Sequence, residues 1–87
     1  MALVSIPRTR ARVRWDRRHA RPASVAWGGR RLRVVAVAAQ RDELAAFPVD
    51  RGPRVTYLVQ TDGAGQASLV FDARAGAWYV EALEAAA

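Results

Sequence analysis

The stretch A-S-V-A-W-G-G-R-R-L-R-V, residues 23–34, decides the fold of this 87-residue chain. Two β-prone runs flank Gly28-Gly29, which predicts a two-residue hairpin turn because glycine takes positive φ at both positions without steric cost. Trp27 then faces Arg30, and the pairing continues as far as Ala23 opposite Val34. The core face carries Ala23, Val25, Trp27, Leu32 and Val34, and the solvent face carries Ser24, Ala26, Arg31 and Arg33. A slip of one residue would bury arginines, so the register is well specified.

On the N-terminal side of this hairpin, residues 9–15 read T-R-A-R-V-R-W, a strict alternation that predicts a strand. The strand places Ala11, Val13 and Trp15 on one face and Arg10, Arg12 and Arg14 on the other. A charged connection, residues 16–22, leads from this strand into the hairpin. On the C-terminal side, residues 34–39 are apolar on both faces, which predicts a strand that curves across a barrel and is covered on both sides.

The rest of the chain predicts further short strands at hairpin spacing. Alternating patterns cover residues 54–61, 66–71 and 77–81, and Gly-containing turns separate them. A short helical turn is expected around 41–47, with Leu44 and Phe47 packing down as a lid before Pro48. The predicted fold is all-β: a small, partly open barrel or meander of five or six strands, SH3-like or OB-like. One domain spans residues 9–83, between a flexible N-terminus (1–8) and a tail (84–87).

Positive charge is concentrated in the first part of the chain. All 14 basic side chains are arginine; ten lie in residues 1–33 with a single acid, giving +9, while residues 34–87 carry −3, for a net charge of +6. Such asymmetry favours an anionic partner, of which nucleic acid is the commonest. The alternative is a solvated face on which arginine only supplies solubility. The absence of cysteine, of a signal peptide and of a long apolar segment predicts a soluble cytoplasmic protein without membrane contact.

The sequence offers little for catalysis or metal binding. The one histidine, His19, lies in an arginine-rich connection, and no serine has the surroundings of a nucleophile. The acidic residues are dispersed, and the glycine pairs join strands rather than opening a helix, so neither a metal site nor a phosphate-binding loop is expected. We therefore predict that the chain is not an enzyme and holds no metal or cofactor.

The arginines instead predict a binding face. If the strand of residues 9–15 lies beside the second strand of the hairpin, five guanidinium groups share one outer surface, and Arg17, Arg18 and Arg21 in the connection extend it. The predicted nucleic-acid-binding residues are Arg10, Arg12, Arg14, Arg17, Arg18, Arg31 and Arg33. Guanidinium forks suit phosphate oxygens.

The aromatic residues bear on how such a face would read nucleic acid. Five of them, Trp15, Trp27, Tyr57, Phe71 and Trp78, are in phase with apolar neighbours and are assigned to the core. Only Tyr79 is out of phase and a candidate for an exposed ring. Because proteins that hold single strands stack bases on exposed rings, backbone contact without base recognition fits this pattern better.

The order of the motifs resembles a known bacterial family. The motifs are Arg21-Pro22-Ala23, Trp27-Gly28-Gly29-Arg30-Arg31, residues 34–37 (V-V-A-V), residues 54–61 (R-V-T-Y-L-V-Q-T), residues 69–72 (L-V-F-D) and residues 76–81 (G-A-W-Y-V-E). Over roughly residues 9–83 the chain is similar to a small domain of unknown function associated with the C-terminal end of Y-family DNA-polymerase-like proteins of mutagenic repair. The resemblance implies an accessory role near DNA and supplies no catalytic residues.

Two function classes follow. The first is a non-enzymatic accessory module that contacts nucleic-acid backbone, with DNA favoured, in repair or lesion bypass. The second is a protein-interaction barrel that docks on a partner such as a polymerase-like protein, or self-associates, through a sheet edge or through Leu44 and Phe47.

Overall fold

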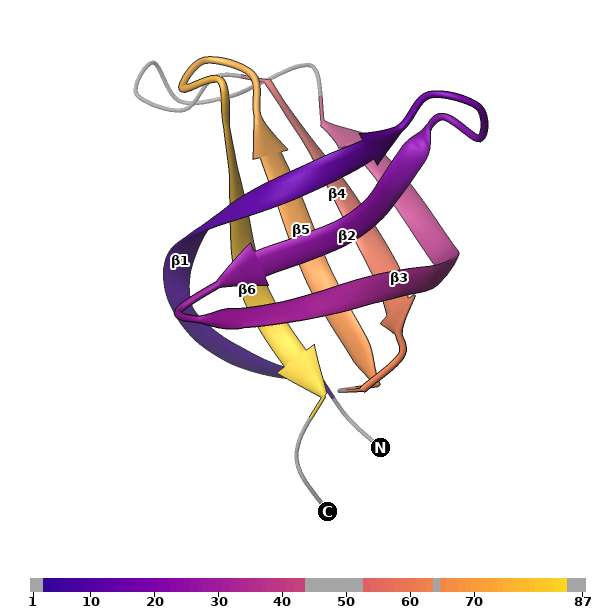
Figure 1. The fold of residues 1–87 in the computed structure, drawn as a ribbon. Helices are drawn as coiled ribbons and strands as arrows, with labels where there is room; N and C mark the ends of the chain where they lie inside the picture. Colours follow the sequence, from indigo (N-terminus) through magenta and orange to yellow (C-terminus); the bar gives the residue numbers. More distant parts are fainter. Residues whose placement is uncertain (1–2, 44–52, 64, 85–87) are drawn as a thin grey trace.

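The computed structural model describes residues 3–43, 53–63 and 65–84, and six strands account for most of them (Figure 1). The strands are β1 (Leu3–Asp16), β2 (Arg21–Trp27), β3 (Arg30–Glu43), β4 (Arg54–Thr61), β5 (Gln66–Asp72) and β6 (Ala77–Glu84). They pair in sequence order, always antiparallel, and β1 pairs with β6 to complete a closed barrel. The predicted all-β barrel is confirmed, and its sheet is fully closed rather than partly open.

Two long strands bend from one side of the barrel to the other. β1 pairs with β6 as far as Ala11 and with β2 from Arg12 onward. β3 pairs with β2 as far as Arg33 and with β4 from Val34 onward. In Figure 1, β2 and the adjoining parts of β1 and β3 cross in front of β4, β5 and β6. The barrel therefore has two layers, and we call the one formed by Arg12–Asp16, β2 and residues 30–33 the front sheet.

The β2–β3 hairpin forms in the predicted register, from Trp27 opposite Arg30 to Ser24 opposite Arg33. The turn glycines have φ of 53° and 79°, the left-handed region that the Gly-Gly pair predicts. On the inner face, Val25 has no exposed surface. On the outer face, Arg31 and Arg33 are exposed. The alternation of apolar and polar residues therefore orients this hairpin as the sequence indicates.

Small and branched residues and one tyrosine fill the barrel. Its buried cluster is Ala11, Val25, Val34, Tyr57, Val59, Ala67, Leu69 and Val80, with Trp27, Leu32 and Trp78 among the partly buried side chains packed against it. Trp15, predicted as core, contacts Tyr57 and Trp78 at ring-centroid distances of 6.0 and 6.2 Å but is 42% exposed. Its ring borders the aromatic cluster instead of being enclosed by it, so the prediction for Trp15 is wrong.

One prediction for β3 is also wrong. Residues 34–39 are not covered on both faces: Val35 is 49% exposed, and Ala36, Ala38 and Ala39 are exposed as well. The pairing with β4 shifts register after Val34 and again after Val37, and these irregularities bend the strand around the barrel while its outer surface faces solvent. The helical turn expected around 41–47 does not form at 41–43, because these residues continue the ladder with β4. Leu44 and Phe47 lie outside the described residues.

The barrel also begins earlier than the sequence predicts. β1 starts at Leu3 rather than at residue 9, and Leu3 and Val4 pair with Glu84 and Leu83 of β6. These pairs place Leu3 and Val4 in the sheet, which the sequence pattern, interrupted by Ser5 and Pro7, does not predict. Glu84, assigned to the tail, is the last described residue of β6.

The β1–β2 and β5–β6 turns share one construction. Oδ1 of Asp16 accepts hydrogen bonds from the backbone N–H groups of Arg18 and His19, at 2.9 and 3.3 Å. Oδ1 of Asp72 accepts the equivalent pair from Arg74 and Ala75, at 3.0 and 3.1 Å. Each turn then closes on a residue with positive φ four positions after the aspartate. That residue is Gly76 (63°) in the second turn and Ala20 (52°) in the first.

Ala20→Gly is therefore expected to stabilise the protein. An alanine in the left-handed conformation costs about 1–2 kcal/mol, a cost that glycine avoids. Glycine loses more conformational freedom on folding, however, and this offsets roughly 0.5–1 kcal/mol of the gain. The net gain is about 0.5–1 kcal/mol, a rise in Tm of roughly 2–8 °C, measurable by thermal denaturation. The mirror substitution, Gly76→Ala, is the control and is expected to lower Tm. A lower Tm for Ala20→Gly would contradict the comparison of the two turns.

Candidate nucleic-acid interface

Four of the predicted arginines, Arg12, Arg14, Arg31 and Arg33, lie on the front sheet with β2 between them, whereas Arg10 lies just outside it, where β1 pairs with β6. Cross-strand pairing sets Arg12 opposite Ala26 and Ala26 opposite Arg31; the next row runs from Arg14 through Ser24 to Arg33. The predicted single surface is conditional on β1 and β3 being neighbours, whereas β2 lies between them and they are two strand spacings apart, about 10 Å. Because the β2 residues between them are small, the two lines of guanidinium groups flank a low strip of backbone.

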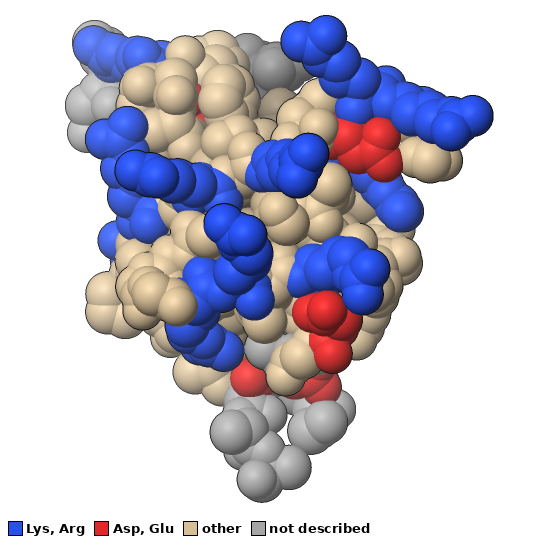
Figure 2. Space-filling view, in the orientation of Figure 1, with Lys and Arg blue, Asp and Glu red and all other residues tan. Residues whose placement is uncertain are grey.

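Most of this face lacks acidic partners. Within the described part of the chain, no carboxylate lies at ion-pair distance from the side chains of Arg10, Arg12, Arg14 or Arg31, and all four are exposed. Figure 2 shows this side of the molecule, where Arg side chains are spread across the surface and acidic ones are few. The charge of these four residues is therefore available to an anionic ligand.

Arg33 differs from the other members of the face. Its Nε lies 3.7 Å from Oδ2 of Asp62, and its backbone N–H donates a 3.1 Å hydrogen bond to Oδ1 of the same residue. The Arg33 side chain is nevertheless 77% exposed. An ion pair this long and this open to water is weak. Arg33 can still contribute to the face, with part of its charge offset by Asp62.

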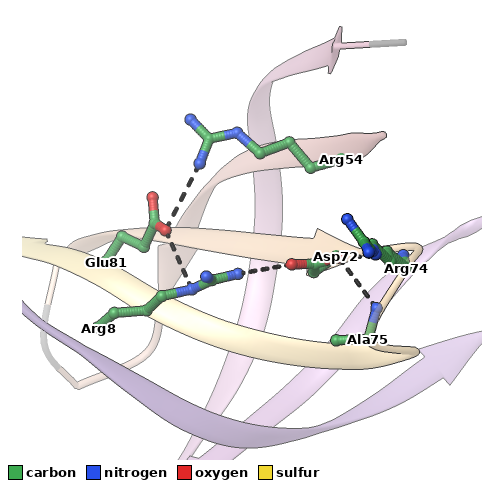
Figure 3. Close-up of polar contacts among 6 residues, drawn as sticks. All are labelled: Arg8, Arg54, Asp72, Arg74, Ala75 and Glu81. Atoms are coloured by element: carbon green, nitrogen blue, oxygen red, sulfur yellow. Dashed lines mark hydrogen bonds and ion pairs between the residues drawn. The ribbon is translucent and has the colours of Figure 1, made fainter. Parts of the chain in front are cut away.

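The arginine that precedes this series on β1, Arg8, is held by acids (Figure 3). Its guanidinium group lies 3.1 Å from Oδ2 of Asp72 and 3.5 Å from Oε2 of Glu81, and Arg54 approaches the same Glu81 oxygen at 3.7 Å. Arg8 also lies over the ring of Tyr79, 3.8 Å from its centroid. Tyr79, predicted as the candidate exposed ring, is therefore on the outer surface but covered by a guanidinium group.

The carboxylate of Asp72 is stabilised by these contacts. The N–H of Ala75 lowers the pKa of Asp72, and the Arg8 guanidinium and the N–H of Arg74 lower it further. Asp72 thus remains ionised and keeps Arg8 paired. Charge on this side of the barrel is balanced locally, in contrast to the front sheet.

Arg17 and Arg18, also predicted as site residues, lie in the β1–β2 turn at the far end of the front sheet and are exposed. Next to them, Nδ1 of His19 lies 2.8 Å from Oδ2 of Asp16, and this hydrogen bond is the main cause that lowers the pKa of Asp16. The turn is roughly 16 Å from Arg12, about five residues of extended strand. The predicted residues therefore form an extended surface rather than one compact site.

A cleft at the opposite end of the front sheet contains residues that the sequence analysis missed. Its volume is about 870 Å³, and it lies between the middle of β1, the β2–β3 hairpin tip and the start of β6. Its lining residues include Arg10, Arg12, Trp27, Arg30, Arg31 and Trp78. Arg30 was not predicted as a site residue, and Trp27 and Trp78 were assigned wholly to the core. The Gly-Gly turn does place Trp27 opposite Arg30, but the cleft depends on the bend of β1, which no local pattern indicates.

The structure offers less support for the alternative function, a protein-interaction barrel. The pairing of β1 with β6 closes the barrel only as far as Ala11. Among the described residues, the segments Arg12–Asp16 and 30–33 pair on one side only, with β2, and these edges carry exposed arginines, which disfavour edge-to-edge docking. The two residues predicted for the other docking mode, Leu44 and Phe47, are not described. Among the described residues, the exposed apolar side chains of β3 are the feature that favours a protein interface.

Other kinds of site find no support in the described residues. Residues 3–43, 53–63 and 65–84 contain no group of three His, Asp or Glu side chains placed to hold a metal ion. In the same ranges there is no helix of the length and apolarity needed to cross a membrane.

Comparison with family models, curated proteins and solved structures finds no match to this chain. The resemblance to the polymerase-associated domain therefore stays a prediction.

Proposed function

We propose that this chain is a non-enzymatic accessory module that contacts the nucleic-acid backbone through the front sheet. The observation that carries the proposal is the set of four exposed arginines without acidic partners, Arg10, Arg12, Arg14 and Arg31. Arg12 and Arg14 lie on one side of β2 and Arg31 on the other, and Arg10 lies next to them on β1, where that strand still pairs with β6. Arg33, Arg17 and Arg18 extend the surface. DNA is the favoured target, and a role in repair or lesion bypass is what the family resemblance implies.

The chemistry of the face supports backbone contact. Guanidinium groups bind phosphate oxygens through two parallel hydrogen bonds and stay charged at every physiological pH. Unpaired surface arginines need not break an existing ion pair to bind, whereas Arg8 would have to leave Asp72 and Glu81. A surface with one sign of charge also raises the rate of association with a polyanion.

Salt dependence is the first test of this function. Five phosphate contacts on duplex DNA predict a log–log slope of affinity against salt of about −4 to −5, so affinity should fall several hundred-fold between roughly 50 and 200 mM salt. Fluorescence anisotropy of labelled DNA and RNA, titrated with the protein at both concentrations, measures this slope. An absence of binding at the lower concentration would overturn the proposal.

A second candidate is the protein-interaction barrel, and the exposure of Val35 with its alanine neighbours on β3 favours it. It predicts a dimer or a partner complex that persists at high salt, because apolar contacts are not screened. Light scattering coupled to size-exclusion chromatography, run in parallel with the titration at both salt concentrations, separates the two. A monomer at both concentrations counts against self-association.

A further inference from the structure

The cleft beside the β2–β3 hairpin arises where β1 changes partners. Ala11 is the last residue of β1 that pairs with β6, and Arg12 is the first that pairs with β2. The hairpin extends past this point, since Trp27 and Arg30 pair with each other while no residue of β1 pairs with Trp27. The resulting space of about 870 Å³ is within the range of clefts that hold small organic ligands, roughly 300–1,000 Å³.

The walls of this cleft are cationic. Arg10 and Arg12 come from β1, and Arg30 and Arg31 come from the hairpin, so guanidinium groups stand on two sides. None of the described residues that line the cleft is acidic. A ligand that fits this lining carries negative charge at more than one point along its length.

Aromatic surface accompanies the charge. Trp27 is half-buried, and the guanidinium carbon of Arg30 lies 5.0 Å from the centroid of its ring. Trp78 contributes to the other wall. The rim consists of glycine at three positions, Gly28, Gly29 and Gly76, where an added Cβ would meet no atom within 4 Å. Arg30 lies over this ring but is exposed, so a flat group can reach the ring of Trp27 when the Arg30 guanidinium group moves outward over the glycine rim.

The combination of arginines with an accessible indole distinguishes between forms of nucleic acid. In a duplex the bases are stacked on each other, and only phosphates and groove edges reach a protein surface. In a single strand each base has a free π-face, and proteins that bind single strands combine a cationic groove with aromatic rings on which bases stack.

We propose that this cleft holds a single-stranded segment of nucleic acid, with one base stacked on Trp27 and the adjoining phosphates bound by Arg12 and Arg31. This inference rests on the proposed function and narrows its target. Arg30, which already lies near the indole ring, then covers the outer side of the stacked base or binds its phosphate. Two further arginines of the front sheet, Arg14 and Arg33, guide the strand away from the cleft.

The test compares labelled single-stranded DNA, single-stranded RNA, duplex DNA and an abasic DNA strand, each about 12 nucleotides long and measured by anisotropy at about 50 mM salt. The wild-type protein is expected to bind a single strand at least tenfold more tightly than duplex. Trp27→Leu keeps an apolar side chain against the core but removes the ring, and it should weaken single-strand binding by roughly 5- to 150-fold. Trp27→Tyr, which restores a ring, should recover most of the loss. The stronger of the DNA and RNA signals identifies the natural strand.

Two controls separate stacking from charge. Trp27→Leu should leave the affinity for duplex and for the abasic strand within about twofold of wild type, whereas Arg14→Ala, outside the cleft, should weaken all four ligands alike. Equal affinity for single strand and duplex, or for normal and abasic strands, would overturn the inference while leaving the proposed function standing. The abasic comparison uses the wild-type protein alone and so decides the matter even if Trp27→Leu fails to fold. Absence of binding to all four ligands would instead overturn the proposed function.

Discussion

Replacement of Leu69 by alanine is expected to lower the free energy of unfolding by about 3–5 kcal/mol. Leu69 is fully buried at the centre of the barrel, with Tyr57 of β4 and Val80 of β6 as its cross-strand partners. Truncation removes apolar contacts and leaves a cavity that a closed barrel cannot easily collapse around. An 87-residue domain has a total stability of roughly 4–13 kcal/mol, so this single change removes a large part of it. Urea denaturation measures the loss, and Tm should fall by more than roughly 10 °C.

Leu58 provides a matched control for Leu69. It is a leucine on the adjacent strand, paired with Ser68 of β5, but its side chain is only half-buried. Leu58→Ala removes the same atoms without opening an enclosed cavity and is expected to cost less than about 1.5 kcal/mol. Similar losses for the two variants would contradict the position of Leu69 at the centre of the core.

The second large effect concerns binding. When five of the predicted arginines are all changed to alanine (Arg10, Arg12, Arg14, Arg31 and Arg33), the salt slope for duplex DNA should lose most of its value of about −4 to −5, and affinity at about 50 mM salt should drop at least a hundredfold. The physical reason is that each guanidinium group that neutralises a phosphate releases condensed counterions, and none of these five is committed to a strong ion pair. Anisotropy at several salt concentrations measures both quantities.

A pair of double variants tests whether position matters beyond net charge. Arg12→Ala with Arg31→Ala removes two unpaired charges from the front sheet and should reduce the slope by about 2. Arg8→Ala with Arg54→Ala removes the same net charge from the ion pairs with Asp72 and Glu81, and it should change the slope by less than about 0.5. Equal effects of the two variants would mean that DNA responds only to total charge and that the front sheet is not the interface.

Local sequence patterns predict those parts of the fold that local geometry controls. Gly28-Gly29 sets the turn, and the alternation around it sets the register, so the pairing from Trp27–Arg30 to Ser24–Arg33 is correct. The pairing of Leu3 with Glu84 depends on residues at opposite ends of the described chain, and no spacing within either segment indicates it. The exposure of Val35 has the same origin: whether anything covers an apolar face depends on the whole barrel.

The residues of the candidate site likewise divide into those that local sequence patterns predict and those that depend on the tertiary structure. The outward direction of Arg10, Arg12 and Arg14 follows from alternation along one strand. That Arg8 is neutralised depends on Asp72 and Glu81, which are more than sixty residues away in the sequence. Trp27 is assigned to the core because it is in phase with Val25, and it does pack there in part. That Trp27 also lines the cleft follows from where β1 stops pairing with β2, which is a tertiary feature.

The pairing of β1 with β6 also affects how the chain acquires its structure. The β2–β3, β4–β5 and β5–β6 hairpins join segments close in sequence, so each can form early at a small loss of chain entropy. Closure must bring Leu3 to Glu84, and on a ribosome it cannot begin until residue 84 has emerged. During that interval the first residues of β1, including the apolar Leu3 and Val4, have no partner strand and are open to association with other chains. Folding of this barrel should therefore be slow for its size, with the pairing of β1 and β6 as the late step that completes the native structure.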